Sequence, residues 1–482
     1  MKVFLTGATG VMGMNGMEQL LSTRINGENV ALTVLARPGK INERKLDPYI
    51  RRGVKVIWGD LLNSRDVARG VAGADVVLHV GGMVSPAADR YPELTYRVNT
   101  ESMRNVVDAV LEREKKGGKV RVVYVGSVSQ YGSRTFPTQW GRTGDPVVGA
   151  AFDSYALSKC DAERILAESG LKEWVSLRQT GIIHVGIFYK ATDPIAFHVP
   201  VSTALEWISD RDSGALLVAV CRKDLPRDFF NNFYNVGGGA SYRMSNYDFM
   251  KAMLRTLGCP APEKIFNLNW FATRNFHGML FEDSDSLDNL LHFRSGESFS
   301  DCLDSLKRTL PFYFRLAPLA PSWLMKGFMK RVALKKPLGT LYWIRSDNNA
   351  RIEAAFGGHE AYDAIPDWKG FTLPDLLGKR RRLDHGYDES KPLSELTLDD
   401  LRKAAEFRGG KCLAPGEGDS SVDPYAPLEW ECSEGHRFLM RPHTILKGGH
   451  WCPQCLKMIY EDPEAMQRLS ASNSFLAQLN DE

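Results

Sequence analysis

Residues 1–13, MKVFLTGATGVMG, decide the fold of this chain. A short apolar stretch with strand character runs into three glycines, and an apolar helical pattern follows. Glycine allows a positive φ and lets a pyrophosphate approach the backbone, while the N-terminus of the next helix attracts negative charge. An ordinary tight turn could also use these glycines, but the features below favour a dinucleotide-binding turn. The residues expected to contact the cofactor here are Gly7, Thr9, Gly10, Val11, Met12 and Gly13.

Strand-like apolar stretches alternate with helical patterns over residues 1–183. Their near-continuous hydrophobicity is typical of a parallel sheet covered on both faces. The pattern predicts a doubly wound α/β fold with a Rossmann sheet. A further stretch at 229–239 is expected to return to this sheet. The six stretches are 3–7, 31–37, 54–60, 74–82, 120–127 and 175–183.

The 482 residues are too many for one compact core, so several domains are expected. The predicted units are a dinucleotide-binding core (1–183), a mostly helical substrate lobe (184–345), a charged linking segment (346–395) and a small C-terminal module (396–482). A net charge of +3 disfavours nucleic acid as the main partner of the whole chain. The sequence shows neither an 18-residue apolar run nor a secretory signal, so a cytoplasmic location without a membrane partner is expected.

Tyr155 and Lys159 stand four residues apart in SYALSK, on one face of a predicted helix. A nearby ammonium stabilises a phenolate and lowers the pKa of a tyrosine, which is about 10 when unperturbed. Upstream, a predicted strand ends at Ser127, and ligands bind at the carboxyl ends of strands in this fold. Ser129 is the competing serine, because it lies two residues on and faces the same way if the strand continues.

These motifs resemble the extended branch of the short-chain dehydrogenase/reductase superfamily, also described as the epimerase/dehydratase family. The resemblance covers roughly the first 340 residues and rests on combined motifs rather than on one. It implies that Ser127, Tyr155 and Lys159 form the catalytic set and that Lys159 also holds the nicotinamide ribose. It also implies cofactor contacts by Asp60 and Leu61 after the third strand and by Asn99 in the helix after the fourth.

The end of the second strand decides between the two nicotinamide cofactors. An acidic residue there would bind the ribose hydroxyls of NAD, but the sequence has Ala36 and Arg37. A guanidinium pairs with a 2′-phosphate. NADP is therefore predicted over NAD, although a surface arginine without a ligand would give the same pattern.

The residues after Ser127 narrow the reaction. Dehydratases of this family carry acidic residues there, because eliminating water needs additional acid–base groups. Here Val128, Ser129 and Gln130 follow, so reduction of a carbonyl, or oxidation of an alcohol, is predicted. A sugar-nucleotide epimerase remains the alternative, with Arg243 available for a pyrophosphate. The expected partner is a small carbonyl or alcohol substrate, and a homodimer is left open.

Four cysteines crowd the last fifth of the chain: Cys412, Cys432, Cys452 and Cys455. Four thiolates bind zinc strongly, and a small module with few large apolar residues needs a structural metal to stabilise its fold. The pattern resembles zinc-ribbon or treble-clef modules. His436 is the alternative ligand to Cys432, and a redox dithiol at 452 and 455 is the alternative function. Because the cofactor motifs lie outside this module, its loss is expected to spare the core.

The module also motivates a function of another class. A catalytically silent cofactor sensor or RNA-binding regulator would use the module as its contact surface. The basic residues available for nucleic acid are Arg437, Arg441 and Lys447.

Overall fold

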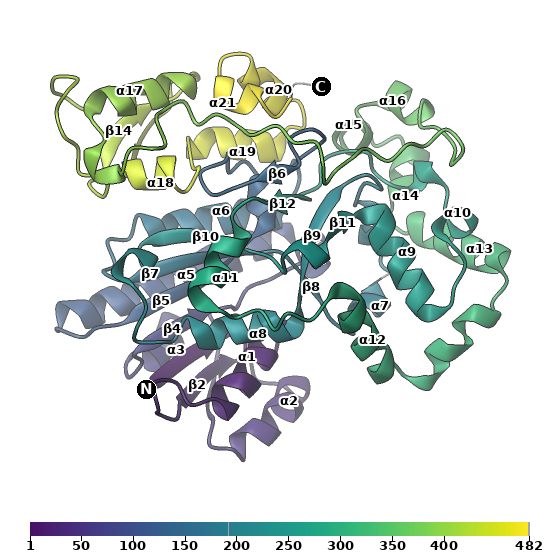
Figure 1. The fold of residues 1–482 in the computed structure, drawn as a ribbon, viewed down its shortest axis with the longest axis horizontal. Coiled ribbons are helices and arrows are strands. Elements are labelled where there is room, and N and C mark those ends of the chain that lie inside the picture. The colour runs from purple at the N-terminus through teal and green to yellow at the C-terminus, as the bar shows by residue number, and fades with distance from the viewer. Residues whose placement is uncertain (191, 481–482) are drawn as a thin grey trace.

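A seven-stranded parallel sheet forms the centre of the computed structural model, which describes residues 1–190 and 192–480 (Figure 1). The strand order is β10-β7-β5-β4-β1-β2-β3, so the chain crosses over after β3 and continues outward on the other side of β1. The predicted doubly wound α/β fold is confirmed. The strands are β1 (Lys2–Thr6), β2 (Ala31–Ala36), β3 (Lys55–Trp58), β4 (Val76–His79), β5 (Arg121–Ser127), β7 (Trp174–Gln179) and β10 (Asn232–Val236).

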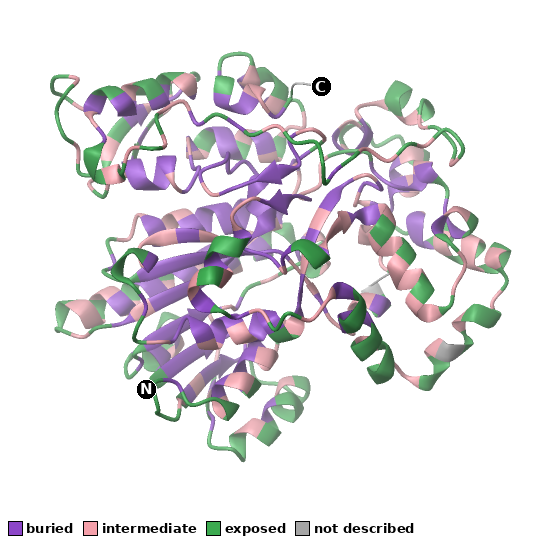
Figure 2. Cartoon of the chain, viewed as in Figure 1, coloured by how far each residue is buried: buried purple, intermediate pink, exposed green. Residues whose placement is uncertain are grey.

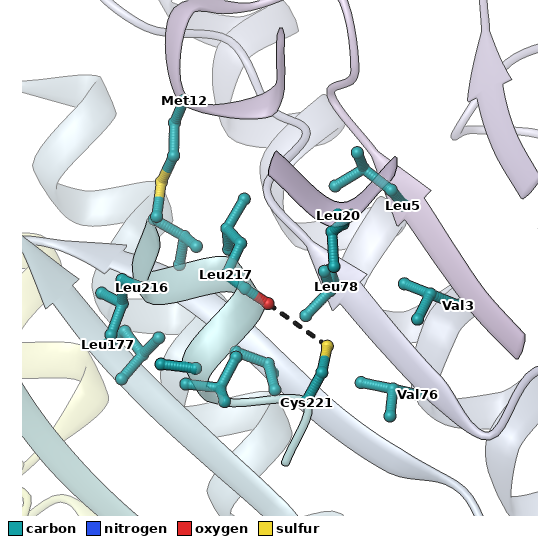
Figure 3. Close-up of a cluster of buried hydrophobic side chains, with 14 of the residues drawn as sticks. Val3, Leu5, Met12, Leu20, Val76, Leu78, Leu177, Leu216, Leu217 and Cys221 are labelled. Atoms are coloured by element: carbon teal, nitrogen blue, oxygen red, sulfur yellow. Dashed lines mark hydrogen bonds between the residues drawn. The ribbon is translucent and has the colours of Figure 1, made fainter. Parts of the chain in front are cut away.

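Alternation along β1 divides the core into two layers. Val3 and Leu5 face a cluster that includes Leu20 of α1 and Leu217 of α8, as Figure 3 shows. Phe4 points to the opposite face, where helices α3, α5 and α6 cover the sheet. The helices flanking the sheet are α1 (Val11–Ser22), α2 (Lys40–Ile50), α3 (Ser64–Val71), α4 (Ala87–Arg90), α5 (Pro92–Lys115), α6 (Ser154–Ala167), α8 (Asp210–Ala219) and α11 (Ser284–Leu291).

A mostly helical lobe lies beyond the carboxyl edge of the sheet, at the right of Figure 1. It also holds a small sheet of β8 (Gly181–Ile183), β9 (Ala204–Ser209) and β11 (Arg243–Ser245), beside the pair β6 (Trp140–Gly141) and β12 (Leu280–Phe281). Its helices are α7 (Ile187–Lys190), α9 (Asn246–Leu257), α10 (Pro262–Ile265), α12 (Phe299–Thr309), the 3-10 segment η6 (Phe312–Leu319), α13 (Ser322–Ala333), α14 (Thr340–Arg345), α15 (Asn349–Phe356) and α16 (His359–Asp363).

The expected linking segment, 346–395, starts with structure that the sequence interpretation missed. Helices α15 and α16 occupy 349–363, and Ile352, Ala355 and Phe356 are buried in a cluster with Trp343. Their spacing of three and four residues is helical, but the surrounding charges obscured it. Further along, His385 is buried against Asp145, with 2.8 Å between Nε2 and Oδ1.

The C-terminal module packs on the core through the helix α6 (Figure 1). Its first helix begins with the predicted capping box of Thr397 and Asp400. Within the described part of the chain, no helix is both long and apolar enough to cross a membrane. The elements of the module are α17 (Leu398–Phe407), β13 (Lys411–Cys412), β14 (Leu428–Glu431), β15 (Arg437–Met440), α18 (Pro442–Leu446), α19 (Pro453–Glu461), α20 (Ala465–Ser470) and α21 (Ser474–Ala477).

Candidate active site and metal centre

The glycine turn between β1 and α1 leaves no room for side chains. Gly7 has a φ of 74°, and a Cβ there would lie 2.7 Å from the backbone nitrogen of Gly81. A Cβ on Gly13 would lie 2.2 Å from the carbonyl oxygen of Gly7. Helix α1 begins at Val11 after Gly10, with no side chain capping it. The first-turn N–H groups therefore face the turn without a side-chain acceptor, as an anion-binding site requires.

Arg37 and Asp60 follow neighbouring strands of the sheet. Arg37 is exposed directly after β2, and no carboxylate stands beside it in the sequence. Asp60 is partly buried after β3, and its Oδ1 accepts from the N–H of Leu62 at 2.9 Å. The carbonyl of Leu61 accepts from Asn105 at 2.8 Å. The sequence argument missed Lys45, whose Nζ donates to the carbonyl of Thr9 at 2.9 Å and adds a cation beside the glycine turn.

Asn99 joins the helix α5 to the loop after β4. Its Oδ1 accepts from the N–H of Met83 at 2.8 Å, and its Nδ2 donates to Ser158 Oγ of α6 at 2.9 Å. A Cβ on Gly82 would lie 2.7 Å from Asn99 Oδ1 and 3.8 Å from Lys159 Nζ. Asn99 therefore holds this loop against the helix that carries Tyr155 and Lys159.

Ser127 is the last residue of β5 and the cap of a 3-10 turn, η1 (Val128–Tyr131). Its N–H donates to Gln130 Oε1 at 2.8 Å, and its Oγ accepts from the hydroxyl of Ser129 at 3.0 Å. Ser129 is fully buried behind it. The side chain of Ser127 lies near the phenol of Tyr155 and acts to lower the pKa of that phenol. Of the two candidate serines, Ser127 is the one whose side chain influences the pKa of Tyr155.

Tyr155 and Lys159 lie one turn apart on α6. Burial raises the pKa of Tyr155 to about 12, and the side chain of Ser127 opposes this rise. Burial also lowers the pKa of Lys159 to about 8. The Lys159 ammonium lies 5.8 Å from the centre of the Tyr155 ring and donates to the carbonyl of Val125 at 2.8 Å. The structure thus gathers a serine, a protonated tyrosine and a lysine of reduced basicity at the carboxyl edge of the sheet.

A cavity of about 440 Å³ lies between this edge and the helical lobe. Gly181, two residues after β7, lines it, and the last residue of β7, Gln179, pairs in register with Ser127. Asp153, two residues before Tyr155, also lines it and lies 3.3 Å from the ring of His277. The sequence could not show this cavity, because its walls come from segments far apart in the chain. Its aromatic lining comprises Phe152, Phe188, Phe197, Trp207, Phe249, Phe266, Phe271 and Phe276.

A second group of side chains gathers in the C-terminal module: Cys432, His436, Cys452 and Cys455. The Nδ1 atom of His436 lies 3.4 Å from the sulfur of Cys432 and 3.6 Å from each of the other two sulfurs. The sulfurs of Cys432 and Cys455 are 3.6 Å apart. Sulfur and nitrogen ligands around one tetrahedral zinc stand about 3.5 to 3.8 Å apart. The four atoms therefore already have the spacing of a single metal shell.

Cys412, predicted as a ligand, lies outside this group, and His436 takes its place. The reason is the register of the small sheet, in which Cys412 pairs with Trp430, two residues before Cys432. The chain approaches Cys432 instead at Gly410, where a Cβ would lie 3.1 Å from the Cα of Cys432. Cys412 is buried in the apolar core of the module, and burial raises the pKa of its thiol.

The module contacts α6 through a buried ionic cluster. Glu163 of α6 receives Arg178 Nη2 at 2.6 Å and His450 Nε2 at 2.9 Å, and all three side chains are almost fully buried. Leu456 of α19 packs with Leu157 and Cys160 of α6. Since α19 begins directly after Cys452 and contains Cys455, two of the clustered thiols belong to the part of the module that touches α6.

Residues 3–178 match the model of the NAD dependent epimerase/dehydratase family. The 3 beta-hydroxysteroid dehydrogenase type 7 of Homo sapiens is 28% identical over 181 residues, covering 33% of this chain and 48% of that protein. The rat protein of the same name is 27% identical over 167 residues, or 34% and 47% of the two chains. The chain thus spans about half the length of these curated relatives.

Solved structures with a similar arrangement include a dTDP-glucose 4,6-dehydratase from Streptomyces venezuelae with NAD and TYD bound. It has 18% identity and a TM-score of 0.49, over 64% of this chain and 96% of that one. A UDP-glucuronic acid 4-epimerase from Bacillus cereus has 16% identity and a TM-score of 0.49, over 64% and 100%.

Proposed function

Because residues 3–178 match the model of the NAD dependent epimerase/dehydratase family, we propose that the chain is an NADP-dependent oxidoreductase that reduces an apolar carbonyl compound or oxidises the corresponding alcohol. The observation that carries the proposal is the meeting of Ser127, Tyr155 and Lys159 at the carboxyl edge of the sheet, beside a largely apolar cavity that Asp153 and Gly181 line. The proposal rests on this geometry and not on the activities of the relatives.

The residues at the glycine turn fit a dinucleotide. A Cβ at Gly7 or Gly13 would clash with backbone atoms of the turn. Glycine at these two positions therefore keeps open the space that a pyrophosphate would occupy. The uncapped start of α1 would hold the pyrophosphate. Asp60 follows β3, and Asn99 of α5 holds the loop after β4. When bound, the nicotinamide supplies or accepts the hydride.

The protein's own side chains carry out the proton transfer to and from the substrate oxygen. In the reducing direction, Tyr155 keeps its proton at neutral pH and donates it to the developing alkoxide. The Lys159 ammonium stabilises the phenolate that remains, and the Ser127 hydroxyl orients the substrate oxygen toward Tyr155. Oxidation of an alcohol runs the same proton transfer backwards.

Arg37 is expected to select NADP. Its guanidinium is exposed at the end of β2, where a 2′-phosphate would lie, and Lys45 adds a second cation nearby. Replacing Arg37 by Ala should weaken NADPH binding at least about tenfold and leave NADH binding within about twofold, since one charge-assisted hydrogen bond contributes about 1.5 to 3 kcal/mol. Nicotinamide fluorescence titration measures both. Arg65→Ala, which changes an exposed arginine of α3, is the matched control. Tighter binding of NADH than NADPH by the parent protein would contradict the assignment.

The cavity favours an apolar substrate over a sugar nucleotide. Its volume falls in the usual range for a small-molecule ligand, and aliphatic and aromatic side chains together make up most of its walls. Arg243, the candidate for holding a pyrophosphate, is instead paired with Glu206 at 2.9 Å between Nε and Oε2. Among the few polar atoms at the cavity, Asp89 Oδ2 is buried with no hydrogen-bond partner among the described residues, and burial raises the pKa of this carboxyl.

A substrate screen tests the proposal directly. We expect the purified protein to oxidise NADPH with bulky hydrophobic ketones or aldehydes and to leave UDP- and dTDP-sugars unchanged. Substrates of increasing apolar size should lower KM until the cavity is full, because each buried methylene contributes about 0.8 kcal/mol. Epimerisation of a sugar nucleotide without net NADPH consumption would instead establish the epimerase alternative.

The regulator alternative finds little support at the module surface. Arg437 Nε donates to Glu431 at 2.9 Å, and Arg441 Nη1 donates to the carbonyl of Ala167 at 3.0 Å. Lys447 is half-buried, and burial lowers its pKa. The basic side chains considered for nucleic acid are therefore engaged or partly withdrawn from solvent.

We also propose that the module binds one zinc ion. Three thiols and an imidazole at tetrahedral spacing form a ligand set that zinc prefers. The hydrogen bonds from Cys452 and Cys455 lower the pKa of Cys432, so the cluster already favours a thiolate. His436 enters as a ligand through Nδ1.

A further inference from the structure

An exposed apolar patch lies on the helical lobe, on η6 and α13. Large apolar side chains on a protein surface are usually scattered, whereas here they fall within 17 residues. Phe312 and Leu319 are 77% exposed and Trp323 is 74% exposed. Figure 2 shows the exposed faces of this lobe, at the lower right. We call this set the 312–328 patch: Phe312, Tyr313, Leu316, Leu319, Trp323, Leu324 and Phe328.

Helix α13 divides its side chains between this patch and the interior. Met325 and Met329 pack against the buried core of the lobe, and Val332 is buried. Trp323, Leu324 and Phe328 lie on the outer side. A helix that faces a folded interior on one side and exposes Trp, Leu and Phe on the other is unusual for a surface in contact with water alone. The outer side therefore needs a partner with an apolar layer.

The segment that carries the patch is rich in basic residues and contains no acidic residue. Residues 305–346 contain nine Lys and Arg and no Asp or Glu, although the whole chain carries a net charge of only +3. Lys330, Arg331 and Lys335 are exposed, and none of these three has an ion pair with a described residue. The region thus presents a strong local positive charge beside its apolar side chains.

We propose that the 312–328 patch docks on the surface of a membrane that contains anionic phospholipid. Trp, Phe and Leu on the outer side of α13 would enter the boundary between headgroups and acyl chains, while the flanking Lys and Arg bind the headgroups. Two copies of this chain joined through the patch would bring two sets of unpaired cations together, which disfavours self-association. The surface therefore fits a partner that is apolar inside and negatively charged outside. This proposal differs from the expectation from sequence, which gave the chain no membrane partner.

The patch and the cavity share a wall. Met329 of α13 lines the cavity one residue from Phe328, and Phe188 of α7 lines it while packing against Phe314 of η6. If the proposed function holds, docking places the cavity next to the phase in which an apolar carbonyl substrate concentrates. Membrane binding itself does not depend on that function, because its test needs no turnover.

Vesicle flotation tests the proposal with the full-length protein. We expect binding to vesicles of phosphatidylcholine with 30% phosphatidylglycerol, weak binding to pure phosphatidylcholine, and a decline in binding as salt is raised, since surface electrostatics are screened. The paired change Lys330→Gln with Arg331→Gln should lower the partition constant at least about tenfold, because each basic residue near an anionic surface contributes about 1 kcal/mol. Trp323→Ser with Phe328→Ser should lower it similarly, through lost apolar burial.

Leu439→Ser provides the matched control. Leu439 is 70% exposed on β15 in the C-terminal module, away from the patch, so this variant should bind vesicles like the parent protein. NADPH binding by all variants confirms that they fold. Equal binding to neutral and anionic vesicles, loss of binding in Leu439→Ser, or retained binding in both patch variants would overturn the proposal. Concentration-dependent dimers that the patch variants abolish, with no vesicle binding, would assign the patch to self-association instead.

Discussion

Replacing Tyr155 by Phe should lower kcat for carbonyl reduction by about a thousandfold and leave NADPH binding within about twofold, because general acid catalysis contributes about 10² to 10⁴. The phenol is the group beside Ser127 that carries a transferable proton at neutral pH. Phenylalanine keeps the ring, so the packing of α6 is preserved. Single-turnover oxidation of NADPH after mixing with substrate measures the chemical step directly.

Tyr124 is the matched control for this prediction. Its ring lies closer to the Lys159 ammonium than that of Tyr155, at 4.8 Å, but its side chain is buried and its hydroxyl faces the carbonyl of Lys159 at 3.5 Å. Tyr124→Phe should therefore keep most of the activity. Equal losses in the two variants would mean that the defect is structural, and full activity in Tyr155→Phe would move the proton donor elsewhere.

The pH profile gives a second measurement of the same mechanism. Burial sets the pKa of Lys159 at about 8, so the side chain is charged at neutral pH and loses its proton as the pH rises through 8. Because kcat/KM reports the free enzyme, it should fall on this alkaline side for carbonyl reduction. Lys159→Arg should retain little activity, but that remainder should stay constant to higher pH because arginine keeps its charge.

The core of the fold could be predicted because its signals are local. The glycine turn after β1 and the buried strands each occupy a few consecutive residues, and their order follows from the rules for parallel sheets. The four-residue spacing of Tyr155 and Lys159 is equally local. Ser127 could be separated from Ser129 only in three dimensions, because β5 ends at Ser127 and the chain turns there into η1.

The features that could not be predicted depend on distant segments. The candidate metal ligands include His436 and not Cys412, because strand register, and not cysteine spacing, decides which side chains meet. The cavity is assembled from residues between Ser85 and Met329. The contact between the module and α6 depends on the buried carboxylate of Glu163. In the sequence, Glu163 looks like an ordinary surface residue of an amphipathic helix.

The contact between the C-terminal module and α6 changes the expected result of removing the metal. Stripping zinc should unfold the module, since metal binding to such small modules contributes on the order of 10 kcal/mol. It should also lower turnover about tenfold or more, because α19 and His450 support the helix that carries Tyr155 and Lys159. The expectation from sequence, that the core is spared, does not allow for the buried contact between Glu163 and His450.

Four variants separate the ligands from the contact. Cys452→Ser and His436→Ala should lose most of the zinc measured by metal analysis, and both should show faster amide hydrogen exchange across α6. Cys412→Ser, the matched control, should keep one zinc per chain because its sulfur lies in the apolar core of the module. His450→Ala should also keep the zinc, yet it should loosen α6, because among the described residues it leaves Glu163 with Arg178, at 2.6 Å, as its remaining ionic partner.

Zinc content tests the ligand set, while amide exchange and turnover test the support that the module gives to α6. Zinc lost from Cys412→Ser, or retained in His436→Ala, would refute the ligand set. Unchanged exchange and turnover after complete metal removal would show instead that α6 holds its geometry without the module. Since Lys159 and Glu163 lie one turn apart on that helix, a module that truly supports Glu163 must affect the position of the catalytic ammonium, and the alkaline limb of the pH profile should shift with it.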